Sequence, residues 1–197
     1  MKMAQIIEEK RWTYEDYLHL TDDKRYEILG GRLSMMVPAP EFNHQLISAR
    51  LQFLIMHFVE SKGLGYVVDA PTDVVLDEEN VVQPDILFIS RENKDTIKKK
   101  GVFGPPDLVV EIVSPSTQYR DVYEKKDLYA RFKVKEYWIV NPYMKCIEVL
   151  SLNEKGTYVL SSEGYMDEGG NRTIQSTVLK DFALDLGKVF KEDFEGG

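Results

Sequence analysis

The sequence has little cysteine, little histidine and no long apolar run. One cysteine and three histidines occur among its 197 residues. A single thiol cannot form a disulfide within the chain or supply a cysteine-rich zinc site, and scattered histidines do not form a zinc site either. No segment approaches the roughly 18 consecutive apolar residues that span a bilayer, and the N-terminus lacks the apolar segment of a secretory signal. We therefore expect a cytoplasmic protein with no membrane partner.

Basic charge is also scarce. The formal net charge is −8, which argues against a protein that coats nucleic acid. A nuclease remains compatible with this charge, because acidic side chains can bind metal ions and basic ones can gather locally. Basic residues do gather at 98–100, at 120–126 and at 131–135. We interpret the lysine triplet at 98–100 as a solvated surface.

The first third of the chain is rich in helix and hairpin signals. Thr13 is placed to cap a short helix that ends near Leu20. Gly30-Gly31 joins two strand-like segments in the pattern of a β-hairpin. After Pro38-Ala-Pro40, apolar residues at helical spacing predict a long amphipathic helix that ends at Gly63.

The rest of the chain alternates strand-like and helical segments. We expect strands at 66–69, 72–76, 85–89, 108–113 and 136–140, a helix at about 121–131, a closing meander at 146–152, 157–161 and 173–178, and a short helix near 190. The helix after strand 108–113 makes a βαβ unit with strand 136–140, so these two strands should be parallel. With 43% apolar residues and no linker, residues 1–197 are predicted to form one α/β (α+β) domain. A mixed central sheet flanked by helices is the expected architecture.

Two acidic residues stand in apolar strands. Glu111 lies within the apolar run 108–113, where an unpaired charge would be costly, and Asp85 opens the run 85–89 directly after a proline. If these strands are neighbours, the two carboxylates can hold a Mg²⁺ ion, which prefers oxygen ligands. Such an ion neutralises a phosphodiester and makes a water nucleophilic. The pair therefore predicts a metal-dependent site that cleaves phosphodiester bonds.

A lysine near this pair would help the attacking water. Asp121, Lys125 and Tyr129 are spaced four apart, which places them on one face of the predicted helix. If the helix packs beside the strand of Glu111, Lys125 can orient or deprotonate the water. The alternative is an ordinary surface ion pair between Asp121 and Lys125.

Two further residues have alternative interpretations. Glu27 lies on the first strand of the hairpin, where an alternating pattern favours a side chain that faces solvent. His44 lies in the first turn of the long helix. It either supports the start of that helix, or it contacts a substrate phosphate or carries a proton.

The chain resembles the Uma family of bacterial proteins classed as restriction endonucleases, formerly a domain of unknown function. The likeness extends from about Trp12 to Phe190. It rests on Tyr-Glu27-Ile-Leu-Gly-Gly-Arg-Leu, His44, Gln-Pro-Asp85, Asp-Leu-Val-Val-Glu111-Ile-Val-Ser-Pro-Ser-Thr117, Asp121-x-x-x-Lys125-x-x-x-Tyr129, Val-Lys-Glu-Tyr-Trp-Ile-Val-Asn-Pro142 and Phe-Ala-Leu-Asp-Leu-Gly187. The run from Glu111 into the following helix is the most specific of these motifs.

The resemblance implies a restriction-endonuclease-like core of the PD-(D/E)xK nuclease superfamily. It implies Asp85, Glu111 and Ile112 as the metal-binding positions, and Glu27 as a further acidic residue of the site. Val113 stands where the superfamily usually has its lysine, and the family pattern moves that lysine to the next helix, here Lys125. The implied assembly is a homodimer, because restriction-type nucleases often pair to cut two strands.

Three functions are compatible with these residues. The favoured hypothesis is an endonuclease that cleaves DNA with Mg²⁺ or Mn²⁺. The second is a catalytically inactive module with a nuclease fold that binds nucleic acid or protein, in which Lys125 or Arg120 would hold Glu111. The third, a glycoside hydrolase with two carboxylates, is weaker because no aromatic stripe lines a sugar cleft near them.

Overall fold

The computed structural model describes residues 10–36, 41–115, 118–167 and 169–191. The predicted start of the long helix at Pro38-Ala-Pro40 and the loop residues Ser116 and Thr117 lie outside these ranges. Within them, no helix is long and apolar enough to cross a membrane.

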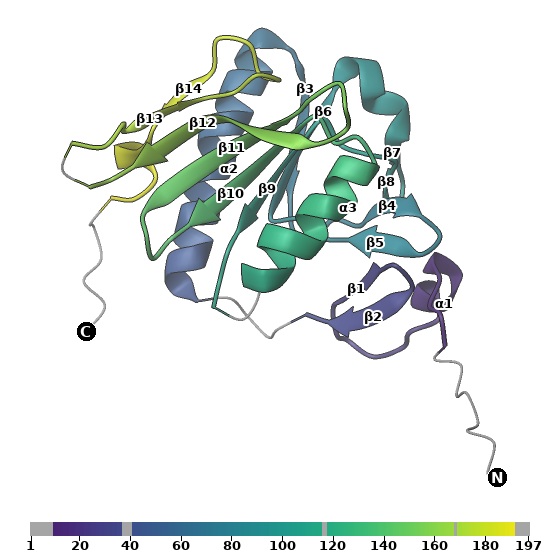
Figure 1. The fold of residues 1–197 in the computed structure, drawn as a ribbon. Helices are drawn as coiled ribbons and strands as arrows, with labels where there is room; N and C mark the ends of the chain where they lie inside the picture. The colour runs from purple at the N-terminus through teal and green to yellow at the C-terminus, as the bar shows by residue number, and fades with distance from the viewer. Residues whose placement is uncertain (1–9, 37–40, 116–117, 168, 192–197) are drawn as a thin grey trace.

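A six-stranded mixed sheet forms the centre of the molecule (Figure 1). Its order is β12 (Tyr158–Tyr165), β11 (Cys146–Leu152), β10 (Glu136–Asn141), β9 (Leu108–Ile112), β6 (Ile86–Ser90) and β3 (Gly65–Asp69). Strands β9 and β10 are parallel and every other neighbouring pair is antiparallel. The predicted βαβ unit and the mixed central sheet are therefore confirmed.

A second six-stranded sheet packs against the first, which the sequence did not indicate. Its order is β2 (Arg32–Met35), β1 (Tyr26–Leu29), β5 (Asn80–Val82), β4 (Val74–Asp77), β8 (Gly101–Phe103) and β7 (Ile97–Lys98). The predicted hairpin is present, and Gly30 and Gly31 make its turn with φ of 59° and 77°. The segment predicted as a strand at 72–76 joins this sheet rather than the central one, because β4 pairs with β5 and β8.

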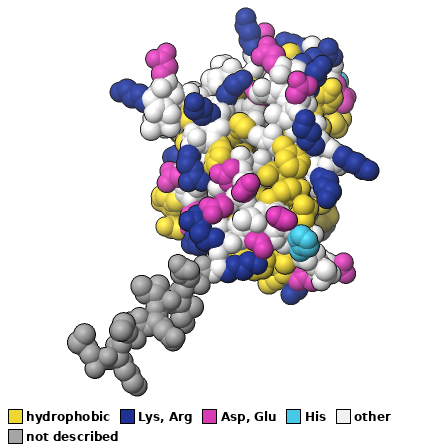
Figure 2. Space-filling view, turned by 90° about the vertical axis from the view of Figure 1, so that its right-hand side faces the viewer, with side chains coloured by type: hydrophobic (Ala, Val, Ile, Leu, Met, Phe, Trp, Pro, Cys, Tyr) yellow, Lys and Arg dark blue, Asp and Glu magenta, His cyan; other side chains and the backbone are white. Residues whose placement is uncertain are grey.

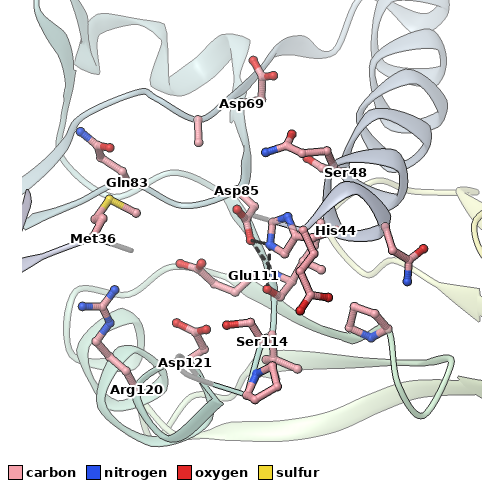
Figure 3. A pocket seen from close by; sticks show the side chains of 18 of the residues that line it. Met36, His44, Ser48, Asp69, Gln83, Asp85, Glu111, Ser114, Arg120 and Asp121 are labelled. Atoms are coloured by element: carbon pink, nitrogen blue, oxygen red, sulfur yellow. Dashed lines mark hydrogen bonds and ion pairs between the residues drawn. The ribbon is translucent and has the colours of Figure 1, made fainter. Parts of the chain in front are cut away.

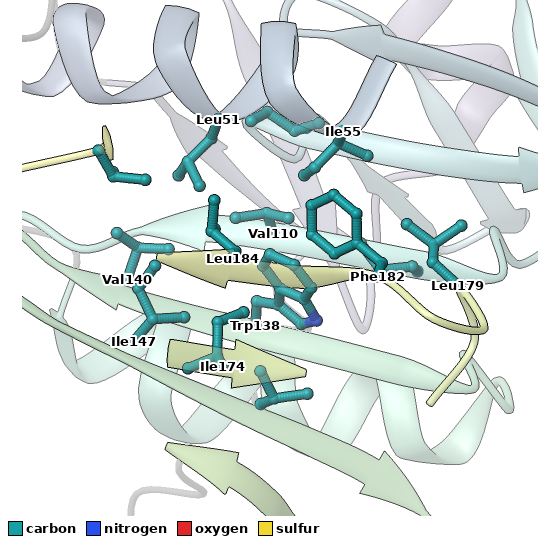
Figure 4. Packing of buried hydrophobic residues seen from close by; sticks show 14 of the residues in the cluster. Leu51, Ile55, Val110, Trp138, Val140, Ile147, Ile174, Leu179, Phe182 and Leu184 are labelled. Atoms are coloured by element: carbon teal, nitrogen blue, oxygen red, sulfur yellow. The ribbon is translucent and has the colours of Figure 1, made fainter. Parts of the chain in front are cut away.

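One face of the central sheet is covered by helix α2 (Phe42–Lys62), which ends, as predicted, at a left-handed Gly63. Its buried residues Ile47, Leu51, Ile55 and Val59 are four apart and line one side of the helix. They pack with the sheet and with the hairpin β13 (Thr173–Gln175) and β14 (Ala183–Asp185) around Trp138 (Figure 4).

The C-terminal part differs from the prediction. Strands β11 and β12 form the expected meander, but β13 leaves it and pairs with β14. Ile174 and Leu184 of this hairpin are buried in the core beneath α2. At the edge of the central sheet, where the meander prediction placed residues 173–178, Ile174 would lack this cover. The short final helix is present as a 3₁₀ turn, η3 (Leu186–Lys188).

The other face of the central sheet is covered by a helix and by the second sheet. The predicted helix at 121–131 is confirmed, but it begins as a π-helical segment, η2 (Arg120–Lys125), and continues as α3 (Lys126–Arg131). A π segment inside a helix frequently marks a functional position. The remaining short helices are α1 (Tyr14–Leu18), capped by Thr13 as expected, and the 3₁₀ segment η1 (Arg91–Thr96).

Charged side chains of both signs are interspersed on the side of the molecule shown in Figure 2, around a patch of hydrophobic side chains. This face has no continuous basic surface.

Candidate functional site

Asp85 and Glu111 lie on neighbouring strands, as the phosphodiester hypothesis requires. Asp85 directly precedes β6, which pairs with β9, and the backbone N–H of Ile112 donates to Asp85 Oδ2 at 2.7 Å. Both side chains line a cavity of about 400 Å³ between the start of α2, the end of β9 and the segment η2. Figure 3 shows them directed into the same space.

Glu111 is held by two groups from the following helix. Lys125 Nζ donates to Glu111 Oε1 at 2.9 Å, and the Tyr129 hydroxyl donates to the same oxygen at 2.7 Å. Lys125 also lies 3.6 Å from Asp121 Oδ1. The alternative of a surface pair between Asp121 and Lys125 is wrong, because both side chains are buried.

Glu27 belongs to the same cluster. It is fully buried, so the alternative of a side chain that faces solvent is wrong. Its Oε1 accepts from the backbone N–H of Gln83 at 2.9 Å and lies 3.0 Å from Lys125 Nζ. Its Oε2 lies 2.7 Å from Arg120 Nη2. Strand β1 of the other sheet thus places a third acidic residue beside Lys125.

Acidic groups crowd this cluster. Four carboxyl groups, those of Glu27, Asp85, Glu111 and Asp121, lie near three basic side chains, those of Lys125, Arg120 and His44. Burial raises the pKa of Glu111 well above its usual value, and the three other carboxylates add to this rise against the lowering by Lys125. A bound divalent cation would favour the ionised form of Glu111 and so oppose this rise.

Lys125 remains protonated in this environment. Burial alone would lower its pKa, but the carboxylates of Glu111, Glu27 and Asp121 raise it above the usual value. An ammonium group held in this way can donate hydrogen bonds and stabilise negative charge. A protonated lysine cannot accept the proton of a water. Of the two roles predicted for Lys125, the environment therefore favours orienting the attacking water over deprotonating it.

His44 contacts both Asp85 and the backbone of Ile112. Its Nε2 lies 3.0 Å from the carbonyl oxygen of Ile112 and 3.4 Å from Asp85 Oδ2. Burial alone would lower the pKa of His44, but the hydrogen bond and charge of Asp85 outweigh it and raise the pKa. The first turn of α2 therefore brings His44 into the candidate site, beyond a role at the helix start.

The oxygen atoms at the site fit a divalent cation that accepts few protein ligands. No described residue donates a hydrogen bond to Asp85 Oδ1 or Glu111 Oε2, so each carboxylate keeps one oxygen for a ligand. Across the described ranges, no three His, Cys, Asp or Glu side chains are grouped to hold a metal ion. The backbone carbonyl of Ile112 is therefore needed as a further donor. Mg²⁺ and Mn²⁺ are commonly bound by one or two carboxylates together with carbonyl oxygens and water molecules.

Gln83 was noted only as part of the Gln-Pro-Asp85 motif, and Arg120 was expected beside Glu111 rather than beside Glu27, its partner in the structure. Gln83 lines the cavity, and its side chain contacts Arg25 and Asp73 at 2.9 Å and 2.7 Å. Its place two residues before Asp85 was a usable signal. The ion pair between Arg120 and Glu27 could not be predicted from the sequence, because 93 positions separate the two residues.

Comparisons with known proteins agree with this architecture. The sequence profile of the Uma2 family, described as "Putative restriction endonuclease", matches residues 14–187. A crystal structure described as "a putative nuclease belonging to DUF820" from Anabaena variabilis ATCC 29413 superimposes with a TM-score of 0.71 at 15% sequence identity. The match covers 90% of this chain and 97% of that chain, so the two share a fold.

A second solved structure is more distant. The type IIG restriction endonuclease BpuSI matches with a TM-score of 0.37 and 16% identity, over 65% of this chain and 14% of that chain. This likeness is too low to support an argument. No protein of curated function matches the sequence.

Proposed function

Because the chain belongs to the Uma2 family of restriction endonucleases, we propose that it is a metal-dependent endonuclease that hydrolyses phosphodiester bonds of DNA. The observation that carries this proposal is the pair of carboxylates on neighbouring strands, each with one oxygen that no described residue binds, in a cavity that Asp121 also lines. A dimer of this chain in the cytoplasm is the assembly and location that the proposal implies.

In this proposal, Asp85, Glu111 and the carbonyl of Ile112 hold a Mg²⁺ or Mn²⁺ ion. When bound, the ion neutralises charge on the scissile phosphate and lowers the pKa of a water ligand. The Ile112 N–H fixes Asp85 through Oδ2, and Lys125 and Tyr129 fix Glu111 through Oε1. The Lys125 ammonium also orients the attacking water and stabilises charge that develops on the phosphate.

Glu27 and Arg120 support Lys125 in this arrangement. Glu27 ties the ammonium of Lys125 to β1, and Arg120 neutralises the second oxygen of Glu27. We assign Glu27 a positioning role, because its side chain is fully buried behind Lys125 and is not among the residues that line the cavity.

A plasmid assay tests the proposal. Purified protein should nick supercoiled DNA with Mg²⁺ or Mn²⁺ and should not do so with EDTA. Asp85→Asn and Glu111→Gln should each lower the rate by at least about 100-fold, since each removes a charged ligand of the ion. Asp107→Asn is the matched control, because Asp107 is a buried carboxylate next to the other end of β9. Equal nicking by the wild type and the two site variants would remove the claim of catalysis.

The second candidate is a catalytically inactive module with the same fold. The ion pair between Lys125 and Glu111 favours it, because a buried carboxylate that already has a cation needs no metal. In that case Mg²⁺ and Mn²⁺ would leave the melting temperature unchanged. An ion that binds the folded protein raises the melting temperature by mass action, so thermal unfolding with and without the ion separates the two candidates.

A further inference from the structure

Arg120 is a cation of the candidate site whose hydrogen-bond donors are largely unused. Its side chain lines the cavity, and Figure 3 shows it on the opposite side of Glu111 from His44. Its Nη2 lies 2.7 Å from Glu27 Oε2. Its Nε is buried and has no hydrogen-bond partner among the described residues. A buried donor without an acceptor costs free energy, which a ligand with an acceptor oxygen would recover.

The ion pair with Glu27 does not by itself account for an arginine at this place. Glu27 Oε1 already accepts from the backbone N–H of Gln83 and lies 3.0 Å from Lys125 Nζ. Glu27 Oε2 pairs with Arg120 by charge, but no group of the described ranges donates a hydrogen bond to it. A lysine would supply the same charge. The guanidinium adds five N–H donors in a planar fork, which matches two oxygens of a phosphate.

A chain of ion pairs fixes the position of this guanidinium relative to the carboxylates. Lys125 Nζ lies 3.0 Å from Glu27 Oε1 and 2.9 Å from Glu111 Oε1, so Arg120 is connected to Glu111 through Glu27 and Lys125. A phosphodiester beside Asp85 and Glu111 would therefore share one cavity with Arg120. Because acidic side chains crowd this cavity, a phosphate that enters it needs cationic donors to offset their repulsion.

We propose that Arg120 binds the substrate directly, with Nε and a terminal nitrogen of the guanidinium donating to the two non-bridging oxygens of one DNA phosphate. This inference rests on the proposed function for the identity of the substrate. The ion pair with Glu27 orients the guanidinium, and the free donors face the ligand. Arginine and phosphate form such two-point pairs with both strength and geometric selectivity. Arg120 is then a substrate-binding residue in addition to a support for Glu27 and Lys125.

The competing role for Arg120 is to balance the charge of Glu27 alone. Arg120→Lys separates the two roles, because it keeps the positive charge beside Glu27 and removes the planar fork. A residue that only balances charge tolerates this change. A residue that binds phosphate through two N–H groups does not. The two roles also differ in whether the Nε–H of Arg120 responds to DNA.

DNA binding by the full chain is the first measurement. Fluorescence anisotropy of a short labelled duplex, with Ca²⁺ as the cation, reports affinity separately from cleavage. Arg120→Lys and Arg120→Gln should each bind at least about ten-fold more weakly than the wild type, since charged hydrogen bonds are lost. Arg120→Gln should also reduce the slope of log affinity against log salt by about 0.9, the value for one phosphate contact.

Arg131→Gln is the matched control for these variants. Arg131 belongs to the same helix, but its Nη2 donates to Asn80 Oδ1 at 3.3 Å and its side chain is not among those that line the cavity. Its DNA affinity and salt slope should equal those of the wild type.

The Nε–H group of Arg120 gives a second measurement that needs no variant phenotype. In ¹⁵N-labelled protein its signal is assigned by its loss in Arg120→Lys. We expect this signal to shift when the duplex is added, and to shift in the same direction with the dinucleotide TpT, which carries a single phosphodiester. The Nε–H signal of Arg131 should stay in place.

The outcomes separate this inference from the proposed function. Wild-type affinity in Arg120→Lys, or an Arg120 Nε–H signal that does not move at saturating DNA, would overturn the inference, while plasmid nicking by the wild type would keep the nuclease. DNA binding through Arg120 without nicking would support the inference and remove catalysis. A wild type that does not bind DNA would overturn both. Circular dichroism checks the fold of each variant, and where a variant is unfolded the wild-type Nε–H signal decides.

Discussion

Strand β9 has a buried carboxylate at each end, and the two have opposite electrostatics. Asp107, just before the strand, accepts hydrogen bonds from Ser90 N at 2.8 Å, Asn93 Nδ2 at 2.9 Å and Lys135 Nζ at 2.6 Å. Burial alone would raise the pKa of Asp107, but these donors lower it. Glu111 is just as buried, yet burial and neighbouring carboxylates raise its pKa despite Lys125.

The comparison shows that burial does not separate a structural acid from a functional one. Both acids have a lysine partner, but Lys135 is 58% exposed whereas Lys125 is 2% exposed. Both oxygens of Asp107 have donors, and three further carboxylates surround Glu111. The chain thus surrounds the carboxylate at one end of β9 with hydrogen-bond donors and crowds the carboxylate at the other end with further acidic groups.

Replacing the lysines should have the largest and most unequal effect. Lys125→Met leaves Glu27, Glu111 and Asp121 buried without their shared cation, so the free energy of unfolding should fall by about 3–5 kcal/mol. Lys135→Met should cost about 1 kcal/mol, because its ammonium is mostly in water. Urea unfolding of both variants measures the difference. Similar losses of unfolding free energy in the two variants would contradict the proposed difference between the two ends of β9.

Asp107→Asn should lower the free energy of unfolding by about 1–3 kcal/mol, because its buried donors lose a charged acceptor. The folded-state pKa of Asp107 is lowered, so its stabilisation is present above its usual pKa of 3.8 and disappears as the pH falls through the lower folded value. The difference in stability between wild type and Asp107→Asn should therefore shrink below about pH 4. A difference that is constant with pH would contradict this assignment.

Tyr129→Phe removes one of the two hydrogen bonds to Glu111 Oε1 and should cost about 1 kcal/mol. The same change lets the carboxylate of Glu111 rotate, so metal affinity should fall while the fold remains. Tyr158→Phe is a control, since its hydroxyl donates to the carbonyl of Val134, away from the cavity. Calorimetric titration of the two variants with Mn²⁺ tests this. Equal Mn²⁺ affinities of Tyr129→Phe and Tyr158→Phe would show that Tyr129 does not support ion binding.

Glu111→Gln should have the smallest effect on stability and the opposite sign to Asp107→Asn. The pKa of Glu111 is raised, so its ionised form opposes folding at neutral pH, and a neutral amide removes that cost. Without metal, Glu111→Gln should therefore melt at the temperature of the wild type or slightly above it. Added Mn²⁺ should stabilise the wild type alone. A clear loss of stability without metal would show that Glu111 is structural.

The sequence predicted the elements whose signals are local. The hairpin at Gly30-Gly31, the helix that ends at Gly63 and the βαβ unit around Lys125 follow from turn chemistry and spacing, and all are present. The sequence also placed Asp85 and Glu111 in two apolar strands, but that these strands are neighbours is shown by the pairing of β6 with β9.

What the sequence could not show depends on contacts between distant segments. Glu27 is buried because β1 pairs with β5 and because Arg120 and Lys125 reach it from η2. The second sheet and the departure of β13 from the meander also arise from long-range pairing. No local pattern contains that information.

Nuclear magnetic resonance with substoichiometric Mn²⁺ tests the difference between the ends of β9 most directly. At about 3.3 Å per residue, the amides of Leu108 and Ile112 lie roughly 13 Å apart, which paramagnetic broadening resolves. We predict that Mn²⁺ broadens the amide signals of Ile112, Val113 and His44 well before those of Leu108 and Ser90, and that Glu111→Gln abolishes this difference. Broadening centred on Asp107, or equal along the strand, would contradict the account.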